Sequence, residues 1–342
     1  MKSVYSGLLA SAALAFLAAP AVAQGKSTLE TVKARGELSC GVNVGLAGFS
    51  SKDDKGEWSG LDADYCRAIA AAVLGDGKKV KFVATTAKER FTALTSGEID
   101  ILSRNTTWTM SRDSSMGMAF AGVNYYDGQG FIVKKSANIK SAKELDGASI
   151  CVQTGTTTEL NLADFFRDNK MKYSPIVFEK ADEAMKAYQG NRCDAYTTDV
   201  SGLYSEKLRT ATPDDHVVLP DLISKEPLGP SVRQGDAQWF SIVKWVHYAM
   251  LNAEEAGITS KNVDQMLTSS TSADVKRILG KDGDFGKGIG LDNDWAVRIL
   301  KQVGNYGEVF DRNVGEGSRL KIARGANKLW KNGGLQYAPP IR

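Results

Sequence analysis

The residues of this chain best suited to hold a small charged molecule lie in one polar stretch, residues 104–112. The stretch reads Arg-Asn-Thr-Thr-Trp-Thr-Met-Ser-Arg and follows a short apolar run at residues 99–102. An apolar run that gives way to Asn, Thr and Trp is typical of a buried strand leaving its sheet, which is where α/β proteins bind ligands. Arg112 can grip a carboxylate through two parallel hydrogen bonds, and Trp108 offers an apolar wall. The stretch predicts a site for an organic anion; the alternative is a surface loop in which Arg112 pairs with Asp113.

Other patterns that could support catalysis or metal binding are weak. The glycine-rich run at residues 286–290 follows no apolar strand and misses the dinucleotide-binding spacing, so we interpret it as a turn. Asp282 and Asp284 lack the remaining ligands of a calcium loop. His216 and His247 are the only histidines, and they occur in no metal-binding spacing. Because the sequence shows no nucleophile elbow and no metal cluster, we expect neither an enzyme nor a cofactor nor a metal.

Two similar series of elements position the polar stretches. In the first, hydrophobic patterning predicts strands and helices in alternation, at residues 38–44, 60–73, 80–84, 87–96 and 99–102. A similar order recurs between residues 148 and 199, where the strands again end in polar loops. The alternation predicts an α/β fold with mainly parallel sheets. Two such units would face each other as lobes across a cleft.

The chain length of 342 residues is about twice that of a typical domain. Two extended stretches on either side of the second unit predict crossings between the lobes, so the first lobe would be discontinuous. We expect lobe 1 to comprise residues 24–131 and 230–342, with a C-terminal helical extension. Residues 132–229 would form the inserted lobe 2.

The first 23 residues have the layout of a secretory signal peptide, with Lys2, an apolar run and a final Ala-Val-Ala. Cleavage near Ala23 would release an exported chain that begins near Gln24. A membrane anchor is the alternative, but the apolar run is too short to favour it. The net charge of +3 comes from 43 basic and 40 acidic residues spread along the chain. Such a balance gives no reason to expect a nucleic-acid partner.

The chain has four cysteines, and in an exported protein they would lie in an oxidising compartment where disulfides persist. Four cysteines can form two disulfides in three different pairings. Cys40 lies in a predicted strand and Cys66 in the helix that follows it. Cys151 and Cys193 lie in two later strands. We favour the neighbour pairing, 40 with 66 and 151 with 193. Free buried thiols are the alternative.

Four polar stretches, in this order after a signal peptide, resemble the polar amino-acid solute-binding proteins of bacterial ABC importers, solute-binding protein family 3. They lie at residues 41–49, 105–112, 154–157 and 198–199. The Asn-Thr-Thr-Trp-Thr sequence and the long C-terminal tail are most similar to the general L-amino-acid binding proteins of the Aap and Bzt systems. The resemblance covers nearly the whole mature chain. It implies a two-lobed type II periplasmic-binding-protein fold and a periplasmic monomer that delivers an L-amino acid to a membrane permease.

The family pattern implies a role for several residues of this chain. Arg112 would bind the ligand α-carboxylate with help from backbone amides near Thr107 and Thr157, and Asp199 would bind the α-ammonium. The remaining ligand-binding residues implied by the resemblance are Asn43, Phe49, Asn105, Trp108, Gln153 and Thr156. Of these, Phe49 would cover the ligand, while Asn43 and Gln153 would touch its side chain.

Asn43 stands where the dedicated glutamate and aspartate binders carry an arginine. A buried ligand side-chain carboxylate would then lack its own cation, which favours a neutral, roomy pocket and broad L-amino-acid specificity. The alternatives are a dedicated glutamate, aspartate or glutamine binder, with Arg104 or Lys88 supplying the cation, and a dehydratase-like periplasmic enzyme on the same scaffold. The enzyme would need an acid-base group in the cleft, such as Asp199 or Glu159.

Overall fold

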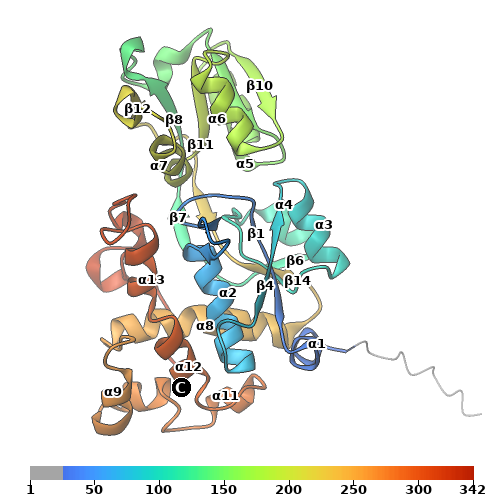
Figure 1. Ribbon diagram of the computed structural model, residues 1–342, viewed down its shortest axis with the longest axis vertical. Coiled ribbons are helices and arrows are strands. Elements are labelled where there is room, and N and C mark those ends of the chain that lie inside the picture. Colours follow the sequence, from blue (N-terminus) through green and yellow to red (C-terminus); the bar gives the residue numbers. More distant parts are fainter. Residues whose placement is uncertain (1–25) are drawn as a thin grey trace, which may run out of the picture.

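The computed structural model describes residues 26–342, and the signal peptide predicted at residues 1–23 lies outside the described residues. Two five-stranded sheets, each flanked by helices, form two lobes that lie one above the other in Figure 1. No helix within residues 26–342 is both long and apolar enough to cross a bilayer.

The sheet of lobe 1 has the strand order β4-β1-β5-β14-β6. Every residue of β1 is buried, as expected for an inner strand of a covered sheet. Because β1 runs parallel to β4 and β5, the carboxyl ends of these three strands meet at one edge. The strands are β1 (Leu38–Asn43), β4 (Val80–Thr85), β5 (Ile101–Leu102), β6 (Met118–Phe120) and β14 (Ser231–Arg233).

The sheet of lobe 2 has the order β10-β9-β11-β8-β12 and packs helices on both faces around two small hydrophobic cores. Its strands are β8 (Gln129–Lys134), β9 (Ser149–Gln153), β10 (Ser174–Phe178), β11 (Ala195–Asp199) and β12 (His216–Val218). Its helices are α5 (Thr157–Asp168), α6 (Ala181–Gln189) and α7 (Val200–Leu208). The elements that the sequence predicts between residues 148 and 199 are present in the predicted order.

The predicted parallel pairing is present in both lobes, where β1 is parallel to β4 and β5 and β9 is parallel to β10 and β11, but each sheet also contains antiparallel strands. In lobe 1 the strand β14 is antiparallel to β5 and β6, and in lobe 2 the strand β8 is antiparallel to β11 and β12. Both β14 and β8 are strands that the chain contributes just after it crosses between lobes. A strand that arrives without a crossover helix is free to pair antiparallel, whereas the βαβ units stay parallel.

Two short strands carry the chain between the lobes, β7 (Tyr125–Asp127) and β13 (Glu226–Leu228), which pair antiparallel. Since β8 begins at Gln129, the second sheet starts slightly before the boundary at residue 132 that we predict. The exact residues at which one lobe ends and the other begins therefore remain a prediction. The predicted division is residues 24–131 with 230–342 for lobe 1 and residues 132–229 for lobe 2.

The helices of lobe 1 and the C-terminal helices share one hydrophobic core, in which α2, α8, α12 and α13 bury their apolar faces. In Figure 1 helices α9, α11 and α12 lie below α8, and α13 lies beside α2. The helices are α1 (Thr28–Arg35), α2 (Leu61–Leu74), α3 (Glu89–Ser96), α4 (Met110–Ser115), α8 (Ala237–Glu255), α9 (Val263–Ser269), α10 (Ala273–Ile278), α11 (Phe285–Gly288), α12 (Trp295–Gln302) and α13 (Tyr306–Asn313). A small hairpin, β2 (Ser51–Lys52) with β3 (Trp58–Ser59), precedes α2.

Both disulfides join the neighbours that we favour. Cys40 on β1 is bonded to Cys66 on α2, with Cα atoms 6.2 Å apart. Cys151 on β9 is bonded to Cys193, which precedes β11, with Cα atoms 5.6 Å apart. Each bridge therefore lies inside one lobe and ties a strand to its neighbouring element.

Candidate ligand-binding site

A small cavity of about 30 Å³ lies between the lobes, where the parallel strands of both sheets end. It has room for a water molecule but not for an amino acid, so a ligand of that size would have to widen it. Lobe 1 contributes α3 and the loop after β5, and lobe 2 contributes the loop after β9 and the end of β11. The lining residues are Arg90, Arg104, Asn105, Thr107, Gln153, Thr156, Thr157, Thr158, Thr198 and Asp199.

Six of the ten predicted ligand residues line this cavity, namely Asn105, Thr107, Gln153, Thr156, Thr157 and Asp199. Two more, Asn43 and Arg112, are hydrogen-bonded to residues that line it. The Asn43 amide nitrogen donates to Asn105 Oδ1 at 3.0 Å, and Arg112 Nη1 donates to the Thr107 carbonyl at 2.8 Å. These contacts hold Asn105 and Thr107, two of the four lobe-1 residues that line the cavity.

The two predicted aromatic residues lie away from the cavity. Trp108 is 38% exposed and stacks on Phe120. Phe49 is fully buried in the core of lobe 1, where its ring meets the edge of Tyr125. In this arrangement neither ring covers the cavity, because packing within lobe 1 already occupies both.

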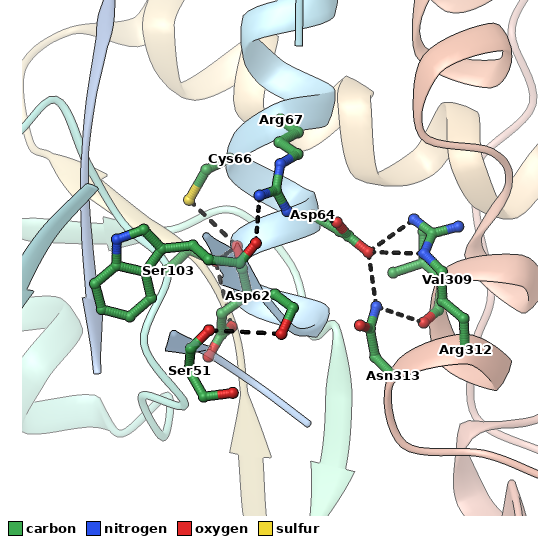
Figure 2. A network of polar contacts seen from close by, with 11 residues as sticks. Ser51, Asp62, Asp64, Cys66, Arg67, Ser103, Val309, Arg312 and Asn313 are labelled. Atoms are coloured by element: carbon green, nitrogen blue, oxygen red, sulfur yellow. Dashed lines mark hydrogen bonds and ion pairs between the residues drawn. The ribbon is translucent and has the colours of Figure 1, made fainter. Parts of the chain in front are cut away.

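The loop after β5 is held in an unusual backbone conformation at Asn105, whose φ is 32°. Asp62, in the first turn of α2, accepts the Asn105 backbone N–H at 2.7 Å. The hydroxyl of Ser103 donates to the same carboxylate at 3.2 Å, and Figure 2 shows this contact. Burial raises the pKa of Asp62 to about 6, so the carboxylate is ionised above that pH and accepts both bonds. Asp62 therefore fixes the path of the ligand loop.

The C-terminal extension braces the same turn of α2 through Asp64 (Figure 2). Asp64 Oδ2 accepts from Arg312 at 2.7 Å and from the Asn313 amide at 2.7 Å, both on α13. Since Asp62 and Asp64 are two residues apart, one helical turn connects the extension to the ligand loop. The packing of the extension, which the sequence does not predict, thus bears on the site.

Three arginines of lobe 1 are buried beside the cavity: Arg90, Arg104 and Arg112. Arg104 Nε donates to the carbonyl of Thr85 at 3.0 Å, and Arg90 Nη1 donates to Thr106 Oγ1 at 3.3 Å. The Nε of Arg90 is buried without a hydrogen-bond partner among residues 26–342. Guanidinium donors thus remain for a ligand.

The three guanidinium groups disfavour one another's charge. Burial lowers the pKa of Arg90 well below its usual value, and the charges of Arg104 and Arg112 lower it further. Burial likewise lowers the pKa of Arg104 to about 10 and lowers the pKa of Arg112. An anion that entered the cavity would relieve both the lost hydration and the mutual repulsion.

Asp199, at the end of β11, faces these arginines from lobe 2. Its carboxylate is buried, and no donor among residues 26–342 is hydrogen-bonded to it. Burial raises the pKa of Asp199 well above its usual value, the charges of Asp127 and Glu226 raise it further, and Arg90 and Arg112 lower it. An incoming cation would stabilise the ionised carboxylate, so the cavity offers an anion site and a cation site on opposite lobes.

The second anion-binding element is the N-terminus of α5. Thr156 caps this helix by accepting from the backbone N–H of Glu159 at 3.2 Å. The backbone N–H groups of Thr157 and Thr158 lie in the first turn, where a helix leaves its donors free and carries partial positive charge. A carboxylate in the cavity would meet these donors from lobe 2.

The two lobes touch each other around the cavity. The Ser205 hydroxyl on α7 donates to the Ala47 carbonyl of lobe 1 at 2.6 Å. Arg209 Nη1 donates to the Gly45 carbonyl at 3.3 Å. The structure therefore shows the cleft in a closed arrangement.

The model of bacterial extracellular solute-binding proteins, family 3, matches residues 38–268. The chain belongs to this family. It is 59% identical over 337 residues to the general L-amino acid-binding periplasmic protein AapJ of Rhizobium johnstonii, covering 98% of both chains. It is 53% identical to the glutamate/glutamine/aspartate/asparagine-binding protein BztA of Rhodobacter capsulatus, covering 100% of this chain and 99% of BztA.

A solved relative supports the same fold. The periplasmic binding protein of Brucella ovis with glutathione bound is 62% identical, superposes with a TM-score of 0.91, and covers 93% of this chain and 100% of that chain. The architecture of this solute-binding protein is thus the two-lobed type II fold that the resemblance implies.

Four residues that line the cavity are not among the ten predicted ligand residues. Arg90 lies on α3, outside any polar loop, and Arg104 lies in the predicted stretch, where the sequence offers it only as the alternative cation of a dedicated acidic binder. Thr158 and Thr198 directly follow or precede predicted residues. Adjacency could have suggested the two threonines, whereas Arg90 could be found only from the packing of α3 against the loop after β5.

Metal binding has no support in the part of the chain that the structure describes. Across residues 26–342, no three His, Cys, Asp or Glu side chains are grouped as a metal ion would require. His247 instead pairs with the hydroxyl of Tyr65, and His216 with that of Tyr188. Both histidines are core residues of this solute-binding protein.

Two carboxylates oppose each other on the crossing strands, since Asp127 on β7 is paired with Glu226 on β13. Burial raises the pKa of Asp127 to about 6 from a usual 3.8, and Glu226 is among the charges that raise it. A raised carboxyl pKa contributes stability that is complete below the unfolded pKa and is lost as the pH rises through the folded pKa. The stability contributed by Asp127 should therefore be present near pH 4 and lost above about pH 6.

We therefore expect Asp127→Asn to stabilise the protein relative to wild type at pH 7.5, by on the order of 2 kcal/mol, and to give little or no gain at about pH 3.5. Urea unfolding of both proteins at the two pH values measures this difference. Asp164→Asn, on the exposed face of α5, is the matched control and should show no such pH dependence. An equal effect of Asp127→Asn at both pH values would contradict the argument.

Proposed function

We propose that this protein is the substrate-binding component of an ABC importer and captures L-amino acids by closure of its cleft. The observation that carries the proposal is the cavity between the lobes, where buried arginines of lobe 1 face Asp199 of lobe 2. A zwitterionic amino acid supplies one anion and one cation at a fixed separation. It therefore matches this pair of sites.

The roles of the residues follow from their places on the lobes. Arg112, with backbone amides near Thr107 and Thr157, would bind the α-carboxylate, and Asp199 would bind the α-ammonium. Since the two charges are met from opposite lobes, only the closed form satisfies both ends of the ligand. A permease that recognises the closed form would then receive loaded protein.

The structure changes the expectation for the ligand side chain. Asn43 supplies no cation, but Arg90 and Arg104 line the cavity, so the pocket is not neutral. Arg104 is placed to accept a second carboxylate, and we therefore place acidic L-amino acids at the tight end of a broad range. Two relatives support this range of ligands by their names. AapJ is named as a general L-amino acid-binding protein, and BztA as a binder of glutamate, glutamine, aspartate and asparagine.

Glutathione is a second class of ligand that one comparison favours. The Brucella ovis relative holds glutathione, a peptide with two carboxylates and one ammonium group. Those charges would suit Asp199 and the arginine cluster. Glutathione therefore belongs in the same binding screen.

The remaining features of the proposal rest on the family. Its members are periplasmic binding proteins, and we infer that this chain is exported, loses its leader near Ala23 and acts in the periplasm as a monomer. We also propose that it has no enzymatic activity, in keeping with the close relatives, which are transport proteins. Incubation with prephenate followed by product analysis tests the dehydratase alternative.

Competition of a labelled L-glutamate by unlabelled glutamate, glutamine, alanine, leucine and histidine tests the specificity. We expect all five to compete within about two orders of magnitude, with glutamate tightest, because the shared α-groups supply most of the charge compensation. D-Glutamate should fail, since inversion at the α-carbon prevents both α-groups and the side chain from being met together. Competition by glutamate alone would make the protein a dedicated acidic binder.

A further inference from the structure

Glu226 is a buried carboxylate to which the proposed function assigns no contact with the ligand. It is hydrogen-bonded to residues of both lobes. It lies on the crossing strand β13 and is 1% exposed. Four side chains donate hydrogen bonds to it, at 2.5 to 2.8 Å: Thr107, Thr157, Asn161 and Ser224. A carboxylate with four donors is fully satisfied, so burial of its charge is compensated locally.

The four donors are divided between the two oxygens in a way that matters for closure. Glu226 Oε2 receives the hydroxyl of Thr107 from lobe 1 at 2.5 Å and that of Thr157 from lobe 2 at 2.8 Å. Glu226 Oε1 receives Asn161 from lobe 2 at 2.7 Å and Ser224 from the crossing segment at 2.6 Å. One oxygen atom thus joins the ligand loops of the two lobes.

This joint is compatible only with a closed cleft. The hydroxyl oxygens of Thr107 and Thr157 lie 3.3 Å apart, and both belong to loops that line the cavity. If the lobes rotate apart about the crossing strands, Oε2 must lose one of its two partners. Because a buried carboxylate that loses a donor is costly, the contact opposes opening.

The same contact determines which groups face the ligand. Each threonine hydroxyl has a single proton, and at both residues it points to Glu226. The hydroxyl protons are therefore unavailable to a ligand carboxylate, which leaves backbone N–H groups and arginine to bind it. Glu226 thereby orients both threonines without touching the ligand.

We propose that Glu226 is a positioning residue that clasps the ligand loops of the two lobes and sets the fraction of closed protein before ligand binds. The proposal deepens the proposed function and rests on it for the consequence in affinity. A ligand that binds only the closed form is bound more weakly when that form is less populated, by the same factor for every ligand.

The test is Glu226→Gln, which keeps the side-chain shape but replaces a four-fold acceptor by a group with one acceptor oxygen and its own donors. X-ray scattering of the ligand-free protein should show a larger radius of gyration than for wild type. Calorimetry should show affinities for glutamate, glutamine and alanine that all fall by about 10-fold, with their order unchanged. Stopped-flow measurements should place the loss mainly in faster dissociation.

A role in ligand contact predicts something different, because it would change the order of the ligands. A role in folding alone would lower the melting temperature without opening the ligand-free protein. Glu183→Gln, an exposed substitution on α6 of lobe 2, is the matched control and should resemble wild type in all measurements. Wild-type affinity and scattering in a normally melting Glu226→Gln variant would overturn the proposal.

A second variant covers the case in which Glu226→Gln does not fold. Thr157→Val removes the lobe-2 hydroxyl from Oε2 but keeps the backbone N–H and nearly the same volume. Its ligand-free scattering should also shift towards the open form, and an unchanged curve would contradict the clasp. If wild type binds no amino acid, the proposed function fails, but the scattering comparison still decides the role of Glu226.

Discussion

Replacement of Arg112 by alanine is expected to weaken L-amino-acid binding by about 30-fold to several thousand-fold. Truncating one member of a buried, hydrogen-bonded charge pair costs about 2 to 5 kcal/mol, which corresponds to that range of dissociation constants. The guanidinium of Arg112 is buried, donates to the carbonyl of Thr107 at 2.8 Å and lies over the ring of Phe91. Its loss would remove a cation and release the loop that carries Thr107.

Two further variants separate these contributions. Arg112→Lys keeps the charge but not the fork of parallel donors, so it should recover only part of the affinity. Arg167→Ala removes an exposed arginine of α5 and should leave binding unchanged. Calorimetry with L-glutamate, together with a melting curve for each variant, is the measurement. Near wild-type affinity in an Arg112→Ala protein that melts normally would remove Arg112 from the site.

Removal of the lobe-2 disulfide by Cys151→Ala with Cys193→Ala is expected to destabilise the protein by about 4 kcal/mol on the chain-entropy model. The bridge closes a segment with a sequence separation of 42, and the unfolded chain gains that freedom when it is absent. The bridge of lobe 1 spans a separation of 26, for which the same model gives about 3.5 kcal/mol. Both estimates are large relative to the net stability of an ordinary domain.

Denaturant unfolding of oxidised wild type, of the lobe-2 double variant and of the equivalent Cys40→Ala, Cys66→Ala variant measures these effects. Non-reducing peptide mapping of the wild type provides the control for connectivity. Free thiols, or a bridge between the lobes, would contradict the pairing. If the lobe-2 variant unfolds at the same denaturant concentration as wild type, the disulfide does not reduce the entropy of the unfolded chain as the model assumes.

Local sequence patterns predicted most elements around the site because they depend on near neighbours. The strand at residues 38–44 and the helix from residue 60 correspond to β1 and α2, and Gly75 ends that helix with a φ of 76°. Such signals arise from burial and capping within a few residues, so they can be read without the fold. The polar loops after β5, β9 and β11 were predicted for the same reason.

Side-chain roles were harder to predict, because they depend on packing between distant segments. Phe49 matches the family position, but its ring is buried against Tyr125. Asn43 lacks the charge of the arginine in related binders, yet Arg104 lines the cavity from the neighbouring strand end. A cation can be supplied from the end of either of two neighbouring strands, and the hydrophobic pattern of each strand stays the same in both cases.

Periodicity and the order of the motifs in the sequence by itself determined the α/β class and the two-lobed plan. Neighbour pairing of the cysteines was favoured among three possible pairings, and the resemblance to a known family implied six of the residues that line the cavity. Only the tertiary structure decided that the sheets are mixed, that three arginines gather in lobe 1 and that Glu226 joins Thr107 to Thr157. The physical reason is that electrostatics and hydrogen bonding act through space, and residues 107, 157 and 226 become neighbours only when the crossing strands bring the two lobes together.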